Sequence, residues 1–276
     1  MTDPILTFDG LRVAFGPTEV VHGLSLTVAP GEVVALVGES GSGKSVSAMS
    51  VLRLLQEPPA HYPGGRILWR GEDVLHMEAK RLRRLRGGEV GMVFQEPMTA
   101  LNPTMTVGRQ VEEALEIHTS LDAAARMARV VELFAAVGIP QPAGRVASYP
   151  HELSGGQRQR ICIAMALACE PQLLIADEPT TALDVTIQAQ ILDLLKALQK
   201  SRGLAVLFIT HDLGLVRELA DRVVVMRHGE AVEQGTVAEV FARPQHAYTR
   251  GLLSCKPVLG HRVARLSTVA DVMMEK

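Results

Sequence analysis

Apolar and polar residues along the first third of the chain form short segments that favour β-strands. Residues 5–15 and 20–30 mix apolar with β-prone residues and are interrupted by Gly and Pro, which is typical of strands. Residues 32–55 run from an apolar strand through a Gly- and Ser-rich loop into an amphipathic helix. Residues 64–74 predict a short hairpin, and 89–97 contain the end of another strand.

From about residue 104 to residue 168, the apolar residues recur at the spacing of helices. Strands are predicted again at 172–177 and 204–210 with a helix over 186–201 between them, and a hairpin follows over 222–235. Buried strands that alternate with helices indicate a mainly parallel sheet with helices on both faces. We therefore predict an α/β fold in which the helical segment forms a separate lobe.

The composition supports a folded domain and does not favour binding to nucleic acid. With 276 residues, of which 47% are hydrophobic, the chain can form one large domain or a core with a smaller lobe. The formal net charge is −2, so bulk electrostatic attraction to nucleic acid is not expected. The basic run KRLRRLR at 80–86 is interpreted as a solvated helix face, with a docking surface for acidic groups as the less favoured alternative.

The cysteines do not predict a disulfide framework or a metal site. Cys162, Cys169 and Cys255 are odd in number and form no CxxC pair, and the first two lie in an apolar helical run where buried thiols are expected. The N-terminus has no signal pattern, and no apolar run approaches the roughly 20 residues that span a bilayer. We expect a soluble, intracellular chain unless a partner carries it to a membrane.

The strongest chemical signal is GESGSGKS at 38–45, which matches the phosphate-binding pattern G-x-x-x-x-G-K-[ST]. Glycines allow the backbone to wrap closely around phosphate oxygens, and the following helix presents its positive N-terminus. Lys44 can reach the β- and γ-phosphates, and Ser45 can offer a hydroxyl to Mg²⁺. The alternative, an ordinary Gly-rich turn, is disfavoured by the strand before the motif and the helix after it. The residues expected to bind the nucleotide here are Gly38, Glu39, Ser40, Gly41, Ser42, Gly43, Lys44, Ser45 and Val46.

Carboxylates that could complete a nucleotide site follow the apolar strand in LLIADEPT at 173–180. Asp177 is a candidate for holding the metal, and Glu178 could orient or deprotonate an attacking water. His211 could contact the γ-phosphate or the water, although a lone histidine is more often structural. Gln95 could sense Mg²⁺ or the water, or be a polar residue at the start of a loop. The candidate catalytic residues are Glu178, His211, Gln95 and Lys44, and the candidate metal ligands are Ser45, Gln95 and Asp177.

Two adjacent glycines in LSGGQRQR at 153–160 come at the start of a predicted helix. Ser154 is a favoured N-cap residue, and Gly155 and Gly156 would expose bare backbone in the first turn. That turn carries free amide hydrogens and the partial positive charge of the helix. It is therefore a second candidate site for an anion.

One nucleotide does not need two such sites from one chain, which suggests a head-to-tail dimer. The loop at 38–45 of one subunit would hold ATP, and the turn at 153–157 of the other would close over its γ-phosphate. The segment TALD at 181–184 would lie at the same seam and couple the two sites through Asp184. The residues expected to face the nucleotide from the partner side are Ser154, Gly155, Gly156, Gln157 and Asp184.

Taken together, these motifs resemble the ATP-binding cassette (ABC) family of transport ATPases. The resemblance covers almost the full length, from Walker A at 38–45 through the glutamine loop, the signature, Walker B and the D-loop to the switch histidine His211. By this resemblance, Phe15 would stack on adenine, with a core phenylalanine as the alternative. The resemblance implies one ABC ATPase domain (1–276) of the P-loop NTPase fold. Within it, a RecA-like core with an antiparallel β subdomain is expected at 1–95 and 169–245, and an inserted α-helical signature subdomain at 96–168. A C-terminal extension is expected at 246–276.

Finer features resemble the ATPase subunits of peptide and nickel importers. They are FQEPMTALNP at 94–103, DEPTTALDVTIQAQIL at 177–192 and HAYTRGLL at 246–253, where relatives often carry proline in place of Ala247. Some relatives also have a C-terminal cysteine cluster for an iron–sulfur centre, which is not expected here because only Cys255 lies in that region. The chain is also similar to the first half of tandem-cassette peptide importers, which leaves open whether it is part of a longer protein.

This resemblance implies an ATPase that powers import of di- or oligopeptides, with nickel, glutathione or peptide antibiotics as alternative cargoes. It implies ATP and Mg²⁺ as cofactors. It also implies a second ATPase subunit, identical or paralogous, transmembrane permease subunits and, indirectly, an extracytoplasmic solute-binding protein. The expected location is peripheral, at the cytoplasmic face of the inner membrane. The segment after Gln95 would pass the nucleotide state to the permease.

Three other classes of protein share part of these features. A soluble ABC ATPase acting on DNA or ribosomes would have the same nucleotide site, but usually has tandem cassettes with a charged linker or a long coiled-coil insert. A small-molecule kinase would explain 38–45 and leave LSGGQ and TALD without a role. An exporter ATPase is disfavoured only by the subfamily resemblance.

Overall fold

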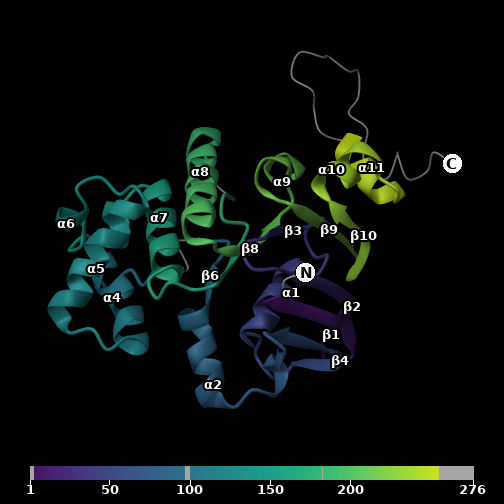
Figure 1. Ribbon diagram of the computed structural model, residues 1–276, viewed down its shortest axis with the longest axis horizontal. Coiled ribbons are helices and arrows are strands. Elements are labelled where there is room, and N and C mark those ends of the chain that lie inside the picture. Colours follow the sequence, from purple (N-terminus) through teal and green to yellow (C-terminus); the bar gives the residue numbers. More distant parts are fainter. Residues whose placement is uncertain (1–2, 97–99, 182, 255–276) are drawn as a thin grey trace.

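The chain is built on two β-sheets, a larger mainly parallel one and a smaller antiparallel one (Figure 1). The computed structural model describes residues 3–96, 100–181 and 183–254. All strands of the six-stranded sheet run parallel except β10, which pairs antiparallel with β9. In spatial order they are β10 (Glu230–Thr236), β9 (Arg222–Arg227), β3 (Val33–Val37), β8 (Ala205–Thr210), β7 (Leu173–Asp177) and β6 (Val90–Val93).

The second sheet is antiparallel, and the hairpin predicted at 64–74 is confirmed within it. Leu68 lies opposite Asp73 in this hairpin. The first strand of the hairpin begins at Ala60, earlier than predicted, because residues 60–69 pair with the strand at 6–15. In spatial order the strands are β2 (Thr18–Val28), β1 (Leu6–Phe15), β4 (Ala60–Trp69) and β5 (Glu72–Asp73).

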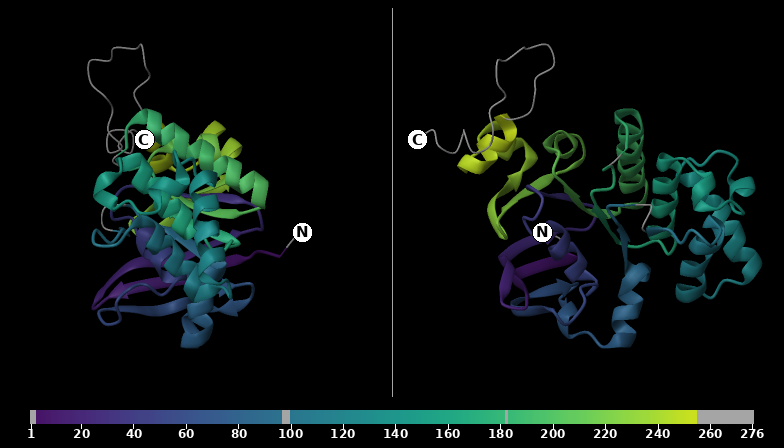
Figure 2. Two further views of the ribbon diagram at one scale, coloured as in Figure 1. Left: turned by 90° about the vertical axis from the view of Figure 1, so that its left-hand side faces the viewer. Right: turned by 180° about the vertical axis from the view of Figure 1, so that it is seen from behind.

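Helices fill the segment between β6 and β7, as the apolar spacing predicted, and form a lobe at one end of the molecule (Figures 1 and 2). The C-terminal helices lie at the opposite end of the molecule, as Figure 1 and the right-hand view of Figure 2 show. The lobe contains α4 (Val107–His118), α5 (Ala123–Ala136), α6 (Pro142–Arg145) and α7 (Gly155–Ala166). The other helices are α1 (Lys44–Val51), α2 (Ala79–Arg84), α8 (Val185–Arg202), α9 (Leu213–Leu219), α10 (Val237–Ala242) and α11 (Ala247–Ser254), and short turns lie at Val74–His76, Leu85–Glu89 and Pro150–Glu152.

The central strands β3, β7 and β8 are buried on both faces, which is why they are nearly continuous apolar runs. On β3, Leu36 packs into the core that the two sheets share with α1, whereas Val37 packs against α9 and the C-terminal helices. On β8, Phe208 packs toward α8 and the helical lobe. The large sheet is therefore held between helices on one face and α1 with the antiparallel sheet on the other, and its strand ends can present polar groups at fixed positions.

The first helix, α1, ends earlier than residue 55, where the predicted strand–loop–helix segment 32–55 ends. It ends at Val51, and Arg53 adopts a left-handed conformation with φ 47°. The Leu54 amide then donates back to the Met49 carbonyl at 3.0 Å, an arrangement that closes a helix C-terminus. The apolar spacing continues past this point because Leu55 still packs against the core between the sheets.

Two expectations about individual side chains are refined. Cys162 is buried, and this burial raises its pKa to about 12; Cys169 is only partly buried, and burial raises its pKa to about 11. Cys255 lies outside the described residues.

Within the basic run at 80–86, Arg83 is solvated as predicted, but Arg81 pairs with Glu72 and Glu89 and is structural. Within the described part of the chain, no helix combines the length and apolar character needed to cross a bilayer.

Candidate functional site

The loop at 38–45 joins the end of β3 to the start of α1, as its motif predicted. Two of its glycines have no room for a side chain. A Cβ at Gly38 would collide with the Met226 carbonyl oxygen, and one at Gly43, where φ is 96°, would lie 2.9 Å from the Val20 oxygen. The loop therefore follows this path only with glycine at these positions, and the alternative of an ordinary exposed turn does not fit.

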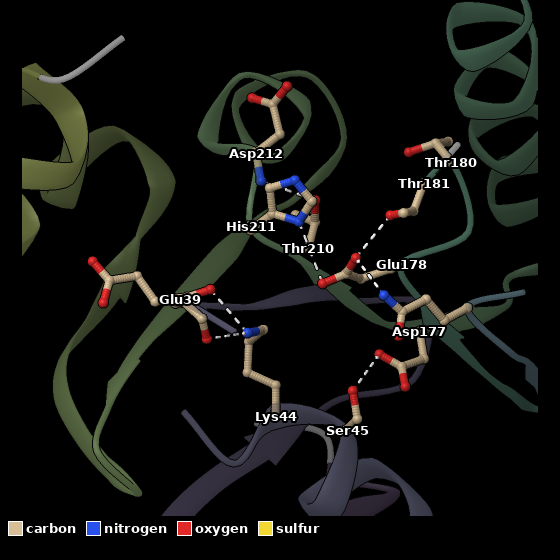
Figure 3. A network of polar contacts seen from close by, with 12 residues as sticks. Glu39, Lys44, Ser45, Asp177, Glu178, Thr180, Thr181, Thr210, His211 and Asp212 are labelled. Atoms are coloured by element: carbon tan, nitrogen blue, oxygen red, sulfur yellow. Dashed lines mark hydrogen bonds and ion pairs between the residues drawn. The ribbon is translucent and has the colours of Figure 1, made fainter. Parts of the chain in front are cut away.

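Lys44 lies beneath the loop with 4% of its surface exposed. Its ammonium group donates to the Gly38 and Glu39 carbonyl oxygens, both at 2.8 Å (Figure 3). It also donates to Ser42 Oγ at 3.3 Å. Burial lowers the pKa of Lys44, and the nearby carboxylates of Glu178, Asp177 and Glu39 partly oppose that shift. The lysine is a fixed positive charge at the inner side of the loop.

Asp177 ends β7 and faces the first turn of α1. Ser45 Oγ donates to its carboxylate at 3.0 Å, and only 6% of the aspartate surface is exposed. Burial raises the pKa of Asp177 and the Glu178 charge adds to the rise, while the Ser45 hydrogen bond and Lys44 oppose it. A hydroxyl and a carboxylate thus meet beside the phosphate loop, which is a donor set that suits a hard cation.

Glu178, the next residue, is the centre of a polar network (Figure 3). Its Oε2 accepts hydrogen bonds from Gln95 Nε2 at 3.1 Å and Thr181 Oγ1 at 2.7 Å, and its Oε1 lies 3.3 Å from His211 Nδ1. Its backbone φ is 46°, an uncommon conformation for a residue other than glycine, and strain of this kind is often found at functional sites. Gln95, Glu178 and His211 are therefore brought together as the sequence predicted, because they follow parallel strands that end at one edge of the sheet.

Neighbouring cavities lie beside this network and share Ser40, Gln95 and Glu178 in their linings. One, of about 570 Å³, is lined by Gly38, Glu39, Ser40, Gln95, Glu178, Thr181, His211 and Leu252. The other, of about 260 Å³, is lined by Val20, Ser40, Gly41, Gly43, Lys44, Ser45, Val46, Gln95 and Glu178. Neither lining includes residues 153–157, so the described residues of one chain do not bring the second glycine-rich turn to these cavities.

The second glycine-rich turn begins α7, and its N-cap is as predicted. The Gln157 amide donates to Ser154 Oγ at 3.3 Å, and the Ser154 amide donates to Gln157 Oε1 at 3.0 Å, which together form a capping box. Ser154 and Gly155 are exposed, whereas Gly156 is buried. A Cβ at Gly156 would lie 2.7 Å from Ile187 Cγ2, so this glycine also has a packing role that the sequence did not reveal.

Comparison with known proteins identifies the family. Residues 21–181 match the sequence profile described as "ABC transporter". The chain belongs to the ABC transporter family. Residues 232–273 also match the profile described as "Oligopeptide/dipeptide transporter, C-terminal region". The predicted family, including its peptide-transport branch, is therefore confirmed.

Relatives of the cassette include several named transport ATPases. The chain is 57% identical to a peptidoglycan transport ATP-binding protein of Agrobacterium fabrum, with 93% of this chain and 48% of the relative covered. It is 53% identical to an oligopeptide transport ATP-binding protein of Bacillus subtilis, where the shares are 92% and 72%. For a dipeptide transport ATP-binding protein of the same organism, the identity is 48% and the shares are 97% and 81%. The chain thus spans about half the length of the first relative and more of the other two.

Solved ABC cassettes have the same fold. A Clostridium perfringens protein described as part of the cbiONQ ABC transporter complex gives a TM-score of 0.76 at 31% identity, covering 87% of this chain and 92% of that one. A dimeric ATP-binding cassette in a post-hydrolysis state with ADP and Pi gives 0.74 at 27% identity, covering 84% and 98%. The predicted ABC ATPase fold is confirmed.

Other residues singled out in the cassette are positioned by local structure. Asp184 is the N-cap of α8, where its carboxylate accepts from the Ile187 amide at 2.9 Å. Phe15 ends β1 and packs, partly buried, against the core between the sheets. The coupling role of Asp184 and adenine stacking on Phe15 stay predictions. Thr181 belongs to the TALD segment predicted at the subunit seam, but its contact with Glu178 was not predicted, although a hydroxyl three residues after Glu178 could have suggested it.

The two signature glycines of the cassette are expected to respond differently to alanine. Gly156→Ala should lower the free energy of unfolding by about 1–3 kcal/mol because its Cβ overpacks Ile187. Gly155→Ala should fold normally, since its Cβ meets Leu183 at 3.7 Å, an ordinary contact. Gly155→Ala should nevertheless lower ATPase activity about 10- to 100-fold, because the added methyl displaces the backbone from the nucleotide expected there. Urea unfolding and steady-state ATPase assays measure the two effects. Full activity of Gly155→Ala would contradict the expected contact.

Proposed function

We propose that this cassette binds and hydrolyses ATP to power the import of di- or oligopeptides through a partner permease. The observation that carries the proposal is the Glu178 carboxylate, held by Gln95, Thr181 and His211 beside the cavities of the phosphate loop. This arrangement suits the activation of a water molecule next to a bound triphosphate.

The phosphate loop would hold the triphosphate through its inward backbone amides and the buried ammonium of Lys44. The α1 N-terminus adds a partial positive charge to the same region. Phe15 would stack on adenine, and residues 38–46 would surround the phosphates. The loop assignments are supported by residues 38–41 and 43–46, which line the cavities, whereas the Phe15 assignment is supported by membership of the family alone.

Mg²⁺ would be held by Ser45 and Asp177, with Gln95 at its outer edge. The hydroxyl and the carboxylate, 3.0 Å apart, are oxygen donors of the kind that Mg²⁺ prefers. Among the described residues, no group of three or more His, Cys, Asp or Glu could hold a metal by itself, which fits an ion that takes its other ligands from phosphate and water. When bound, the ion would neutralise charge on the phosphates.

Glu178 would orient the attacking water and accept its proton while the bond to the γ-phosphorus forms and the bond to the leaving ADP oxygen breaks. His211 and Gln95 would fix the carboxylate and the water, and His211 would also contact the γ-phosphate. Phosphoryl transfer depends mainly on such positioning and on charge stabilisation. Lys44 would stabilise charge on the β- and γ-phosphates throughout.

The ATPase would act as a head-to-tail pair of cassettes, either two copies of this chain or one copy and a paralogue. Ser154 and Gly155 are exposed, and no residue of 153–157 lines the phosphate cavities within the described part of one chain. A partner could therefore supply this turn to the γ-phosphate. Gln157 and Asp184 would lie in the same seam. A solved cassette described as dimeric supports the pairing of two cassettes.

Peptide import is proposed from the C-terminal profile match and from relatives named for oligopeptide and dipeptide transport. We further propose transmembrane permease subunits as direct partners and an extracytoplasmic solute-binding protein as an indirect one. The cassette would then lie at the cytoplasmic face of the inner membrane. Nickel chelates, glutathione and peptide antibiotics are alternative cargoes.

The test begins with purification of the tagged cassette from detergent-solubilised membranes of its source cells. Permease subunits identified by mass spectrometry are expected to accompany it. In proteoliposomes that contain this complex and its binding protein, oligopeptides should stimulate ATP hydrolysis, whereas nickel chelates and glutathione should not. Copurification with DNA or ribosomes in place of a permease, or stimulation by another cargo alone, would contradict the proposal.

A further inference from the structure

Tyr248 on α11 reaches the phosphate loop from the C-terminal region of the chain. Its side chain is almost fully buried, with 1% of the residue exposed, and its phenol oxygen accepts a hydrogen bond from the Glu39 amide at 3.0 Å. Tyr248 lies within residues 232–273, and Leu252 on the same helix lines the larger of the phosphate-loop cavities. Two segments that are 209 positions apart in the sequence are thus in direct contact.

The Glu39 amide belongs to the same peptide group as the Gly38 carbonyl, and this group is held at both ends. Its oxygen accepts from the Lys44 ammonium group at 2.8 Å, and its N–H donates to Tyr248 at 3.0 Å. Rotation of the peptide group would break both contacts. The phenol oxygen therefore acts on the orientation of a carbonyl that positions the buried lysine.

Tyr248 is itself firmly held. The Arg227 guanidinium carbon lies 5.1 Å from the centre of its ring, within the range of a cation–π interaction. The start of α11 is anchored to β10, because the Gln245 and His246 amides donate to the Glu233 carboxylate at 2.7 and 3.0 Å. Burial raises the pKa of Tyr248, so the phenol stays neutral at physiological pH.

A second contact from the β9–β10 turn holds the same loop. The Gly229 amide, in that turn, donates to the Ser42 carbonyl oxygen at 3.2 Å. Ser42 follows Glu39 by three residues in the loop, so the loop is held at two separate points. The loop is thus supported from outside by neighbouring elements. Of these two supports, only the Tyr248 contact comes from a side chain, so one substitution can remove it without altering backbone or packing.

We propose that Tyr248 is a positioning residue that sets the affinity for ATP by fixing the Gly38–Glu39 peptide group and, through it, Lys44. Tyr248 in this way acts on the nucleotide site without touching the nucleotide. The inference rests on the proposed binding of ATP at the phosphate loop. It predicts an effect on the binding of ATP that is separate from an effect on the chemical step.

The test compares Tyr248→Phe with the full-length wild-type chain. Phenylalanine keeps the buried ring under Arg227 and removes only the acceptor oxygen. Because Tyr248→Phe keeps the Lys44 charge and reduces only the order of the loop before ATP binds, KM and Kd for ATP should rise about fivefold while kcat changes by less than about twofold. Hydrogen exchange at the peptide that contains Glu39 should become faster in the nucleotide-free variant.

Tyr62→Phe is the matched control. It also removes one buried phenol oxygen, and Tyr62, on β4, makes no hydrogen bond to residues 38–45 among the described residues. Its KM, Kd and exchange rates should equal those of the wild type. If the wild type binds ATP but Tyr248→Phe has unchanged KM and unchanged exchange, or loses only kcat, the inference is wrong and the proposed function is unaffected. If the wild type itself does not bind ATP, the proposed function fails instead.

Discussion

Glu178→Gln is expected to lower kcat for ATP hydrolysis about 100- to 1,000-fold, which corresponds to about 2.7–4 kcal/mol in the barrier. Glutamine keeps the size of the side chain but cannot accept the proton of the attacking water. The Kd for ATP should remain close to that of the wild type, because Lys44 and the loop glycines are untouched. The ATP-bound, closed pair of cassettes should therefore accumulate.

Single-turnover hydrolysis and equilibrium ATP binding, measured on the same preparation, separate the two effects. Glu230→Gln is a suitable control because it neutralises an exposed carboxylate on β10, and it should hydrolyse ATP at the wild-type rate. If Glu178→Gln hydrolyses ATP as fast as this control, then Glu178 does not activate the water.

Lys44→Ala should weaken ATP binding about 10- to 100-fold, since each hydrogen bond to a charged group contributes about 1.5–3 kcal/mol. The buried ammonium also holds the Gly38 and Glu39 carbonyl oxygens, both at 2.8 Å, so its loss frees the loop as well as removing a charge from the site. Both effects act on binding. Hydrolysis at saturating ATP should fall too, because the charge on the β- and γ-phosphates is no longer stabilised.

Isothermal titration with ATP measures the change directly. Lys80→Ala, which removes an exposed lysine of α2, should bind ATP as the wild type does. Equal Kd values for Lys44→Ala and Lys80→Ala would show that the phosphate loop at 38–45 is not where ATP binds.

The core of the site could be predicted because its chemistry is local or depends on one rule of topology. The glycines and lysine of 38–45 define their loop by spacing alone. Gln95, Glu178 and His211 follow predicted parallel strands, and the ends of such strands share an edge. Neighbouring strands thus bring these side chains together without further knowledge of packing.

Contacts that depend on the tertiary arrangement were not predictable in this way. The Tyr248 hydrogen bond joins residues 209 positions apart, and no periodicity in the sequence encodes which loop α11 covers. The close packing of Gly156 on Ile187 depends on how α7 meets α8. The early end of α1 depends on a single left-handed residue, Arg53, within an otherwise continuous apolar spacing.

In the proposed mechanism, two cassettes enclose each ATP molecule, and both contact its γ-phosphate. The most direct test is a structure of the Glu178→Gln protein with ATP, Mg²⁺ and its partner cassette. Lys44 and the phosphate loop of one cassette are expected to bind the phosphates, while Ser154 and Gly155 of the other contact the γ-phosphate. A nucleotide with all of its γ-phosphate contacts from one chain would contradict this mechanism.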